Sequence, residues 1–431
     1  MAQKYTRIRG TRDITPAESH KWRYVERAAL EIAANYGFGE LRTPIIEKTG
    51  LFIKSTGETT DIVQKEMYSF EQGREEITIR PELTPGAVRA ALETGLLAEV
   101  LPLKVSYIGP CFRHENPQAG RYRQFTQFGL ECFGSQSPSA DVEVICMARD
   151  LFERLGIEDI VLNINSIGCP DCRPDYHKKL VEYYRAHYDE LCDTCKERLE
   201  RNPLRLLDCK VDSCRALAND APKTLEHLCG ECAAHFEGLK TRLDAVGIKY
   251  RVNPFIVRGL DYYTKTVFEF VSDKIGAQSS VGGGGRYDPL VESMGGPPTP
   301  GIGFAMGLDR IIMAMEQTGS PFPGAKACDI YIGSMGEDES LKALQLACVL
   351  RGEGFRAECD TIGRSVKAQM KYADKTGAAY SCIIGSNELE AGVVKIKNMR
   401  SGEASEISLS DKAFSDFLYG EYAGRIPGLG L

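Results

Sequence analysis

The residues best suited to chemistry lie in one stretch, residues 107–134, which reads YIGPCFRHENPQAGRYRQFTQFGLECFG. Arg113, Arg121 and Arg123 supply guanidinium groups, which bind phosphate oxygens through paired hydrogen bonds and stay charged when partly desolvated. The flat ring of Phe125 suits stacking on a purine. Because the net charge of the chain is −7, a general attraction to anions does not explain these arginines. The stretch instead predicts a local site.

The same stretch predicts a polar pocket floor. KVSYIGPCFRHE and RYRQFTQFGLECFG are typical of two β-strands joined through the loop NPQAG. Gln127, Gly129 and Glu131 alternate, so they share one face of the second strand, and the apolar residues between them face the core. A solvated sheet face with cross-strand ion pairs is the simpler alternative, and the hairpin alone does not decide.

A second motif, RPELTPGAVRA, places Glu82 and Thr84 two residues apart, just before a helix that we expect to start near Pro85. A carboxylate and a hydroxyl at this spacing can hold an ammonium group. Thr84 is also well placed to cap the helix, and the two roles are compatible.

Three further motifs carry arginine or glycine. In VRGLDYYTKTVFEF, Arg258 precedes Tyr262 and Tyr263, a weak signal because an arginine before a strand is usually solvated. SSVGGGGRYDPLV has four consecutive glycines, which we expect to form a loop that closes over a ligand. It matches neither the phosphate-binding loop nor the dinucleotide fingerprint. GIGFAMGLDRI leads into a helix whose first turns carry Arg310, where the helix N-terminus adds to the attraction for anions.

Eight of the fifteen cysteines form close pairs between residues 169 and 232. In a chain without a secretion signal, this usage favours metal sites or thiols over disulfides. The spacing predicts a structural Zn²⁺ site, with closed thiolate ligands and no open position for catalysis. Metal-free buried thiols are the alternative. The predicted ligands are Cys169, Cys172, Cys192 and Cys195, and the remaining pairs, Cys209 with Cys214 and Cys229 with Cys232, allow a second site.

The remaining composition is ordinary for a soluble globular protein, with 431 residues of which 43% are hydrophobic and 26% charged. This length predicts two or three domains. No apolar run is long enough to span a bilayer, and the opening MAQKYTRIRG has no signal-peptide core. We therefore expect a cytoplasmic protein without a membrane partner.

The elements that must position these residues follow from the apolar patterns. Strand-rich segments interrupted by amphipathic helices make up residues 1–168 and 251–317, which we expect to form one catalytic domain in two parts. The cysteines lie among helical runs, so we expect residues 169–250 to be a mainly helical, cysteine-rich insertion domain. TGSPFPGAK, at residues 318–326, is typical of a linker, which we expect over residues 318–327. Strands alternate with helices in residues 328–431, which predicts an α/β domain with a mostly parallel sheet.

Together these motifs resemble the class II aminoacyl-tRNA synthetases, and within them the histidyl-tRNA synthetases. TPIIEKTGLF resembles the first motif of the class, FRHENPQAGRYRQFTQFGLECFG the second and GIGFAMGLDRI the third. RGLDYYTKTVFEF and GGGGRYD resemble the two signatures of the histidine enzymes, and RPELTPGAVRA fits as well. The resemblance spans almost the whole chain and implies an α+β catalytic domain with a mostly antiparallel sheet, a homodimer and a C-terminal anticodon-binding domain. The cysteines depart from the family's usual pattern.

The resemblance implies that the chain joins L-histidine and ATP, bound with Mg²⁺, into histidyl-adenylate and transfers the histidyl group to the 3′ end of histidine tRNA. It implies that Arg113 grips the α-phosphate and that Arg258 lies across the α-phosphate and the substrate carboxylate. For the rest of ATP, the resemblance implies contacts of the outer phosphates with Arg121 and Arg310, and of adenine with Phe125 and Glu115. For histidine, it implies contacts of the ammonium group with Glu82, Thr84 and Gln127, and of the imidazole nitrogens with Glu131 and Tyr263. Tyr262 is also implied in the histidine site.

Two other interpretations remain open at this point. A non-catalytic paralogue that senses histidine and regulates a histidine-biosynthetic enzyme would lose ATP- and tRNA-binding parts, whereas this chain keeps the three arginines at 113, 258 and 310 and the C-terminal domain. A zinc-containing RNA adaptor would not need Glu82, Gln127 and Glu131 on pocket faces. Both are disfavoured relative to the enzyme.

Overall fold

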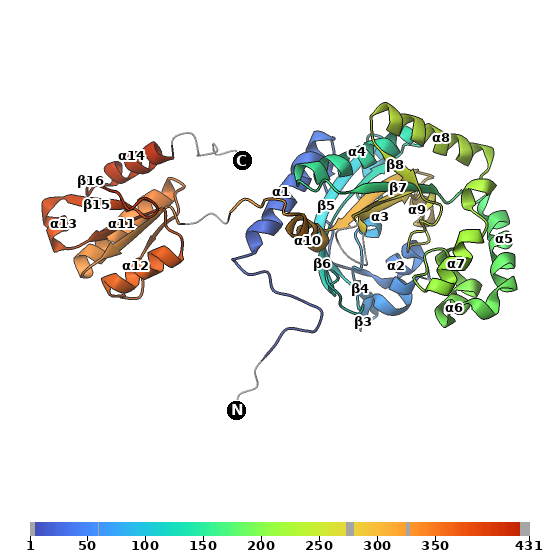
Figure 1. Ribbon diagram of the computed structural model, residues 1–431, viewed down its shortest axis with the longest axis horizontal. Coiled ribbons are helices and arrows are strands. Elements are labelled where there is room, and N and C mark those ends of the chain that lie inside the picture. The colour runs from blue at the N-terminus through green and yellow to red at the C-terminus, as the bar shows by residue number, and fades with distance from the viewer. Residues whose placement is uncertain (1–4, 59, 273–279, 325–327, 423–431) are drawn as a thin grey trace. The chain divides into compact units, whose positions relative to one another are not determined.

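The chain divides into two compact units, Met1–Pro323 and Gly324–Leu431 (Figure 1). Residues 325–327 of the predicted linker and residues 423–431 of the predicted C-terminal domain lie outside the described residues. The computed structural model describes residues 5–58, 60–272, 280–324 and 328–422. None of the helices in these ranges is long and apolar enough to cross a bilayer.

The first unit is built on one large sheet. Within the described residues its strands run in the order β1-β5-β6-β11-β10-β9-β7-β8. Neighbouring strands are antiparallel, except for the parallel pairs β1–β5 and β7–β8 at the two edges. The mostly antiparallel sheet implied by the family resemblance is therefore present. The bounds are β1 Gly39–Glu40, β5 Leu103–Phe112, β6 Gln124–Phe133, β11 Gly301–Gly307, β10 Ser280–Arg286, β9 Thr264–Val271, β7 Val161–Ser166 and β8 Tyr250–Val252.

One face of this sheet shares an apolar core with four helices (Figure 1). Phe128 and Leu130 of β6 are fully buried in it, as the alternating pattern predicted. Ser137 caps the N-terminus of helix α4, because its side chain accepts a hydrogen bond from the Ser139 amide at 3.2 Å. The helices are α1 Ser19–Asn35, α4 Pro138–Arg154, α8 Gly230–Ala245 and α10 Leu308–Thr318.

Helix α3 packs on the opposite face, where Val88 shares a small core with Val105 and Phe133. Beside α3 lie helix α2 and a small antiparallel sheet of order β2-β4-β3. This face also carries the polar residues of β6, so α3 and the small sheet stand next to the predicted pocket. The bounds are α2 Thr49–Thr56, α3 Thr84–Glu93, β2 Ile46–Lys48, β3 Tyr68–Gln72, β4 Glu75–Ile79, η1 Ile62–Glu66, η2 Leu96–Ala98 and α9 Leu290–Ser293.

Between β7 and β8 the chain forms a series of mostly short helices. Most of them enclose a small core of their own, which includes Tyr176, Leu180 and Leu206. Helix α8 differs because its Phe236 and Leu239 join the core of the main sheet. The other elements of this segment are α5 Arg173–Ala186, η3 Tyr188–Glu190, α6 Asp193–Arg201, η4 Pro203–Leu206, α7 Asp212–Asp220 and η5 Thr224–His227.

The second unit holds a sheet of order β13-β12-β14-β15-β16. Strand β12 pairs in parallel with β13 and β14, whereas β14–β15 and β15–β16 are antiparallel. The sheet is therefore mixed, and the prediction of a mostly parallel sheet holds only for its first three strands. The bounds are β12 Ile330–Ser334, α11 Glu337–Gly352, β13 Ala357–Cys359, α12 Val366–Lys375, β14 Tyr380–Ile384, α13 Ser386–Ala391, β15 Val393–Asn398, β16 Ala404–Ser408 and α14 Asp411–Glu421.

Candidate active site

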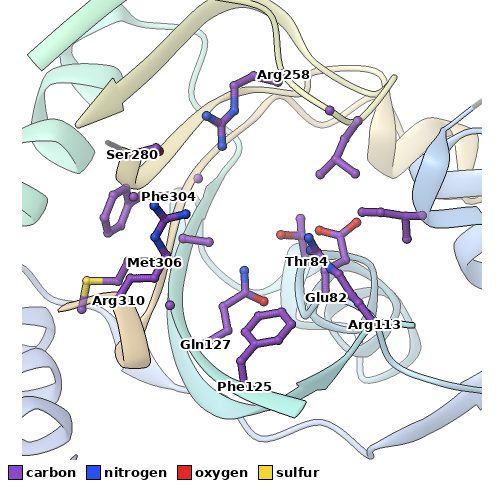
Figure 2. A pocket seen from close by; sticks show the side chains of 18 of the residues that line it. Glu82, Thr84, Arg113, Phe125, Gln127, Arg258, Ser280, Phe304, Met306 and Arg310 are labelled. Carbon is purple, nitrogen blue, oxygen red and sulfur yellow. The ribbon is translucent and has the colours of Figure 1, made fainter. Parts of the chain in front are cut away.

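A cavity of about 280 Å³ opens on the face of the main sheet that carries Gln127 and Glu131. Figure 2 shows Arg258, Arg310 and Glu82 around its opening, although these residues come from distant parts of the chain. The structure thus brings together every residue predicted to contact ATP or histidine, while the role of each stays a prediction. The predicted residues among those that line the cavity are Glu82, Thr84, Arg113, Glu115, Arg121, Phe125, Gln127, Glu131, Arg258, Tyr262, Tyr263 and Arg310.

Glu82 is an almost completely buried carboxylate at the wall of this cavity. One of its oxygens accepts a hydrogen bond from the Thr56 hydroxyl and the other from the Tyr262 hydroxyl, both at 3.1 Å. Burial raises the pKa of Glu82, and the positive charge of Arg113 opposes this shift. A cationic ligand would favour the ionised form of Glu82, so this site is suited to an ammonium group.

Thr84 does not cap helix α3, because Leu83 occupies the N-cap position and Thr84 is the first helical residue. Its hydroxyl instead lies 3.2 Å from the Tyr107 hydroxyl. Tyr107 donates its only hydroxyl proton to Glu131 at 2.6 Å, so Thr84 must be the donor to Tyr107. The lone pairs of the Thr84 oxygen are then left to accept from a bound ligand.

Glu131 is the most tightly enclosed carboxylate of the site, with 1% of its surface exposed. Its two oxygens accept hydrogen bonds from Tyr107 and Tyr287. Burial raises the pKa of Glu131 to about 7, although both tyrosine hydrogen bonds act to lower it. The group therefore titrates near neutral pH.

Tyr107 and Tyr287 were not among the predicted site residues. The signal for Tyr107 was the glycine at position 129 inside a strand pattern. The structure places Tyr107 opposite this glycine on β5. A side-chain carbon at Gly129 would sit 2.5 Å from the Tyr107 ring, so the glycine makes room for the ring. Tyr287 belongs to the GGGGRYD motif, but nothing in the sequence shows that its hydroxyl reaches Glu131.

The hairpin β5–β6 supplies the charged side chains of the opposite wall. The Arg113 guanidinium lies over the Phe125 ring, 5.4 Å from its centroid, and its Nε donates to the Pro81 carbonyl at 2.9 Å. Arg121 forms an ion pair with Glu115 at 2.9 Å. Burial raises the pKa of Glu115, and Arg121 and Arg113 counteract the shift. Two side chains predicted to contact different parts of ATP thus contact each other.

Two further arginines complete the positive side of the cavity. Arg310 lies in the first turn of α10, where burial and the nearby Arg121 lower its pKa, although a guanidinium stays charged. The Arg258 guanidinium lies 5.9 Å from the Tyr263 ring centroid and 3.7 Å from a Glu269 oxygen. The cavity therefore offers several fixed positive charges beside the two buried carboxylates.

The glycine run is a strand rather than a loop. Gly282–Gly285 lie inside β10, between β9 and β11, so the expectation that this run closes over a ligand is wrong. The reason is space, because an added Cβ at Gly283 would lie 2.7 Å from Arg258, and one at Gly285 would lie 2.9 Å from the Tyr263 ring. Residues 273–279, which precede the run, lie outside the described residues.

The eight paired cysteines form two groups of four, but the predicted grouping is wrong. The first and last pairs meet at the base of the inserted segment, and the two middle pairs meet further along it. Helices α5 to α7 leave and return between the first and last pairs, which spacing alone does not reveal. In each group all four sulfur atoms lie within 4.8 Å of one another. We call Cys169, Cys172, Cys229 and Cys232 the outer cluster, and Cys192, Cys195, Cys209 and Cys214 the inner cluster.

The chain is similar to known proteins over most of its length. A family model described as histidyl-tRNA synthetase matches residues 10–311, and one described as an anticodon binding domain matches residues 329–413. A histidine–tRNA ligase from Acetivibrio thermocellus is 54% identical over 402 residues, which cover 93% of this chain and 96% of that protein. A histidine–tRNA ligase from Desulforamulus reducens is 50% identical over 407 residues, covering 94% and 97% of the two chains. The crystal structure of apo S. aureus histidyl-tRNA synthetase superposes with a TM-score of 0.81 at 36% identity, over 96% of this chain and 100% of that one.

Proposed function

The chain belongs to the histidyl-tRNA synthetase family and is a histidine–tRNA ligase, and we propose that the cavity on its main sheet is where histidine and ATP react. The observation that carries this proposal is the convergence of twelve predicted contact residues, from distant segments, on one cavity. The carboxylate of histidine would attack the α-phosphorus of ATP, forming histidyl-adenylate and releasing pyrophosphate. The 3′-terminal ribose of the tRNA would then take the histidyl group and release AMP.

The first step needs positive charge around the phosphates rather than a protein nucleophile. We propose that Arg113 binds the α-phosphate, that Arg258 spans this phosphate and the attacking carboxylate, and that Arg121 and Arg310 hold the outer phosphates. ATP would enter with Mg²⁺ as its substrate complex. Because Arg121 now pairs with Glu115, binding would exchange that carboxylate for phosphate oxygens. Glu115 would then be released to reach the adenine amino group beside Phe125.

The buried acceptors suit the histidine itself. The ammonium group would lie among Glu82, Thr84 and Gln127, and the imidazole nitrogens would pair with Glu131 and Tyr263. An amino acid without an imidazole would leave Glu131 buried and without its ligand partner. Sites that hydrogen-bond a substrate reject analogues that lack the group by factors on the order of 10⁴. Specificity would therefore arise from the polar end of the cavity.

We propose that each thiol cluster holds one structural Zn²⁺. In the outer cluster, sulfur–sulfur distances of 3.7, 3.8 and 3.9 Å match the edge of about 3.8 Å expected for a tetrahedron with Zn–S bonds of about 2.3 Å. In the inner cluster, Cys192 and Cys209 are 3.9 Å apart. One backbone amide also donates to a sulfur in each cluster, from Cys169 and from Cys192, both at 3.3 Å. Such amide donors are typical of thiolate ligands.

The other partners follow from the rest of the chain. We propose that the C-terminal unit binds the anticodon of histidine tRNA, supported by the family match over residues 329–413. We also propose a homodimer, supported by exposed apolar side chains on the small sheet. Ile46 of β2 is 56% exposed, and Phe70 of β3 is 44% exposed. Sedimentation of the purified chain would test the dimer.

The decisive experiment is ATP–pyrophosphate exchange, measured without tRNA, with each of the twenty amino acids in turn. Exchange with histidine alone is the expected result. Exchange with another amino acid would overturn the assignment of Glu131 and Tyr263. Folded protein that binds histidine without any exchange would instead indicate a regulatory paralogue.

A further inference from the structure

We propose that the outer cluster supports the histidine end of the cavity, and that Arg173 is the positioning residue that connects the two. This inference rests on the proposed function, because it concerns Tyr263, one of the two residues assigned to the imidazole. Arg173 directly follows the second cysteine of the first pair, Cys172, and lies outside the cavity.

The first cysteine pair is hydrogen-bonded to the segment that carries Tyr263. The Arg173 guanidinium donates to the Tyr263 carbonyl at 2.6 Å and also reaches the Gly168 carbonyl at 3.4 Å. The Gly168 carbonyl further accepts from the Thr264 hydroxyl at 3.0 Å and from the Lys265 amide at 2.8 Å. Three successive residues, which we call the pocket segment (Tyr263, Thr264 and Lys265), are therefore bonded to the residues that flank the first pair, Gly168 and Arg173.

The second cysteine pair holds the same segment from its other end. Glu231, which lies between Cys229 and Cys232, accepts from the Lys265 ammonium at 2.7 Å. Among the described residues, Lys265 is the one non-glycine residue with a positive φ, 49°. Such a backbone costs on the order of 1–3 kcal/mol and persists only where the surroundings enforce it. Contacts from both cysteine pairs help to enforce it here, together with the ion pair between the Lys265 ammonium and Asp288 at 3.6 Å.

A metal ion is what would fix both pairs at once, because 56 residues separate Cys172 from Cys229. The backbone also packs closely against the cluster, since a Cβ at Gly168 would lie 2.8 Å from the Cys172 sulfur. Without the ion, only sulfur contacts would join the two pairs directly, and the packing of α8 on the main core would be the remaining restraint on Glu231. Binding of Zn²⁺ would therefore fix the backbone of Tyr263.

This arrangement predicts an effect on histidine rather than on ATP. Three of the four arginines assigned to phosphates, Arg113, Arg121 and Arg310, lie on the β5–β6 hairpin and on α10 rather than on the segment 263–265. Arg258 is the exception, because its guanidinium lies 5.9 Å from the Tyr263 ring centroid. The inner cluster is a natural contrast, because the chain between its two cysteine pairs donates from Asn202 to the Asp261 side chain at 2.8 Å, two residues before Tyr263.

The test compares Arg173→Met with Lys196→Met in the full chain. Lys196 follows Cys195 in the inner cluster as Arg173 follows Cys172 in the outer one, but its ammonium lies over the exposed Tyr188 ring. Histidine-dependent exchange, zinc content and melting temperature are measured for each variant. For Arg173→Met we expect the KM for histidine to rise about tenfold while the KM for ATP changes less than twofold and the zinc content stays the same. Lys196→Met should match the parent.

A second pair of variants tests the part played by the metal. Cys232→Ser should lose one zinc per chain and raise the KM for histidine, and adding Arg173→Met to it should cause no further rise, because both act through Tyr263. Cys214→Ser should lose one zinc with a smaller change in that KM. An unchanged KM for histidine in Arg173→Met, or equal rises for histidine and ATP, would overturn the inference.

Two further results keep the outcomes distinct. If Arg173→Met does not fold, Arg173→Lys decides, because a lysine can reach only one of the two carbonyls and should raise the KM for histidine about threefold; no rise would overturn the role. If the parent chain holds no zinc, the metal's part is overturned. Failure of the parent to exchange with histidine would overturn the proposed function instead.

Discussion

The active-site cavity and the cysteine-rich insert both unite residues that are distant in the chain, but different forces hold them. The cavity stands on central strands whose other face is buried in the main core, so the sheet fixes Gln127 and Glu131. Helices α6 and α7 of the insert have only nine residues each, below the length of about 12–15 residues at which isolated helices persist. The cavity should therefore tolerate side-chain changes without losing its shape, whereas the insert should depend on its thiol clusters.

Removal of metal should have the largest effect and should fall on the insert. A structural zinc site contributes on the order of 10 kcal/mol of folding free energy, which the small core of the insert does not replace. Treatment with a strong zinc chelator should make residues 173–228 the first target of trypsin, while fragments of the main sheet persist. Mass spectrometry of the digest gives the cleavage sites.

The matched variants for this experiment are Cys214→Ser and Cys348→Ser. Cys214 belongs to the inner cluster, whereas Cys348 is exposed on the second unit and belongs to neither cluster. Only the first should speed digestion of the insert. The same digestion pattern and melting temperature with and without chelator would mean that the thiols hold no metal.

Replacing Arg258 with histidine should have the largest effect on activity and almost none on the fold. Loss of one preorganised charge at a developing anion costs about 10²–10³-fold in rate, and we expect the upper end, about 4 kcal/mol, because Arg258 is assigned to both reacting groups. Single-turnover adenylate formation measures this loss, and the melting temperature should stay within about 2 °C.

Arg251→His is the control for Arg258, because Arg251 is exposed on the edge strand β8. This variant should keep the parent rate. A near-normal rate in Arg258→His would remove Arg258 from the mechanism and leave Arg113 as the main ligand of the α-phosphate. A large loss of stability would show that the arginine supports the fold instead.

How far the sequence could predict the structure also differs between the two regions. The period of two in β6 placed Gln127 and Glu131 on one face and Phe128 on the other, because strand geometry follows from local chain geometry. The family motifs supplied the distant residues such as Arg258. In the insert the paired cysteines predicted metal-binding thiol clusters. Which pairs meet depends on the path of helices α5 to α7, which the spacing of the cysteines does not encode.

The glycine run shows a second limit of this kind. Four glycines are as typical of a flexible loop as of a strand crowded by its neighbours, and only the tertiary structure shows the rings and the guanidinium that occupy the space beside β10. Tyr287 was missed for a related reason. Its hydroxyl donates to Glu131 across the intervening strand β11, a contact that requires the register of the sheet.

Glu131 should make histidine binding depend on pH. Its pKa of about 7 means that the carboxylate form, which accepts an imidazole N–H, becomes dominant only above neutral pH. The KM for histidine should therefore fall about tenfold between pH 6 and pH 8, which corresponds to about 1.4 kcal/mol. Exchange assays across this range measure it, and the KM for ATP serves as the internal reference.

In Glu131→Gln the part of this pH dependence that comes from the protein should disappear, leaving only the titration of the substrate imidazole near 6.5. Stability gives an independent check of sign. A carboxyl whose folded pKa is raised from 4.5 to about 7 contributes stability at low pH that is lost as pH rises through 7. The variant should thus lose less stability than the parent between pH 5 and pH 8. Equal pH profiles for the two proteins would show that Glu131 does not titrate in this range.

Thr84→Val should have the smallest effect of these changes, and it tests how the polar side chains of the cavity are held in place. The hydroxyl donates to Tyr107, which donates to Glu131, so its loss removes one hydrogen bond and one ligand acceptor while the volume stays the same. One such bond is worth about 1 kcal/mol, or roughly a fivefold rise in the KM for histidine. Thr84→Ser keeps the hydroxyl and should bind as the parent does. Because Thr84 lies inside α3 and not at its cap, the melting temperature should hardly change in either variant. A marked loss of stability in the valine variant alone would mean that the Thr84–Tyr107–Glu131 chain holds the pocket together, and that the cavity, like the insert, depends on a few specific polar contacts.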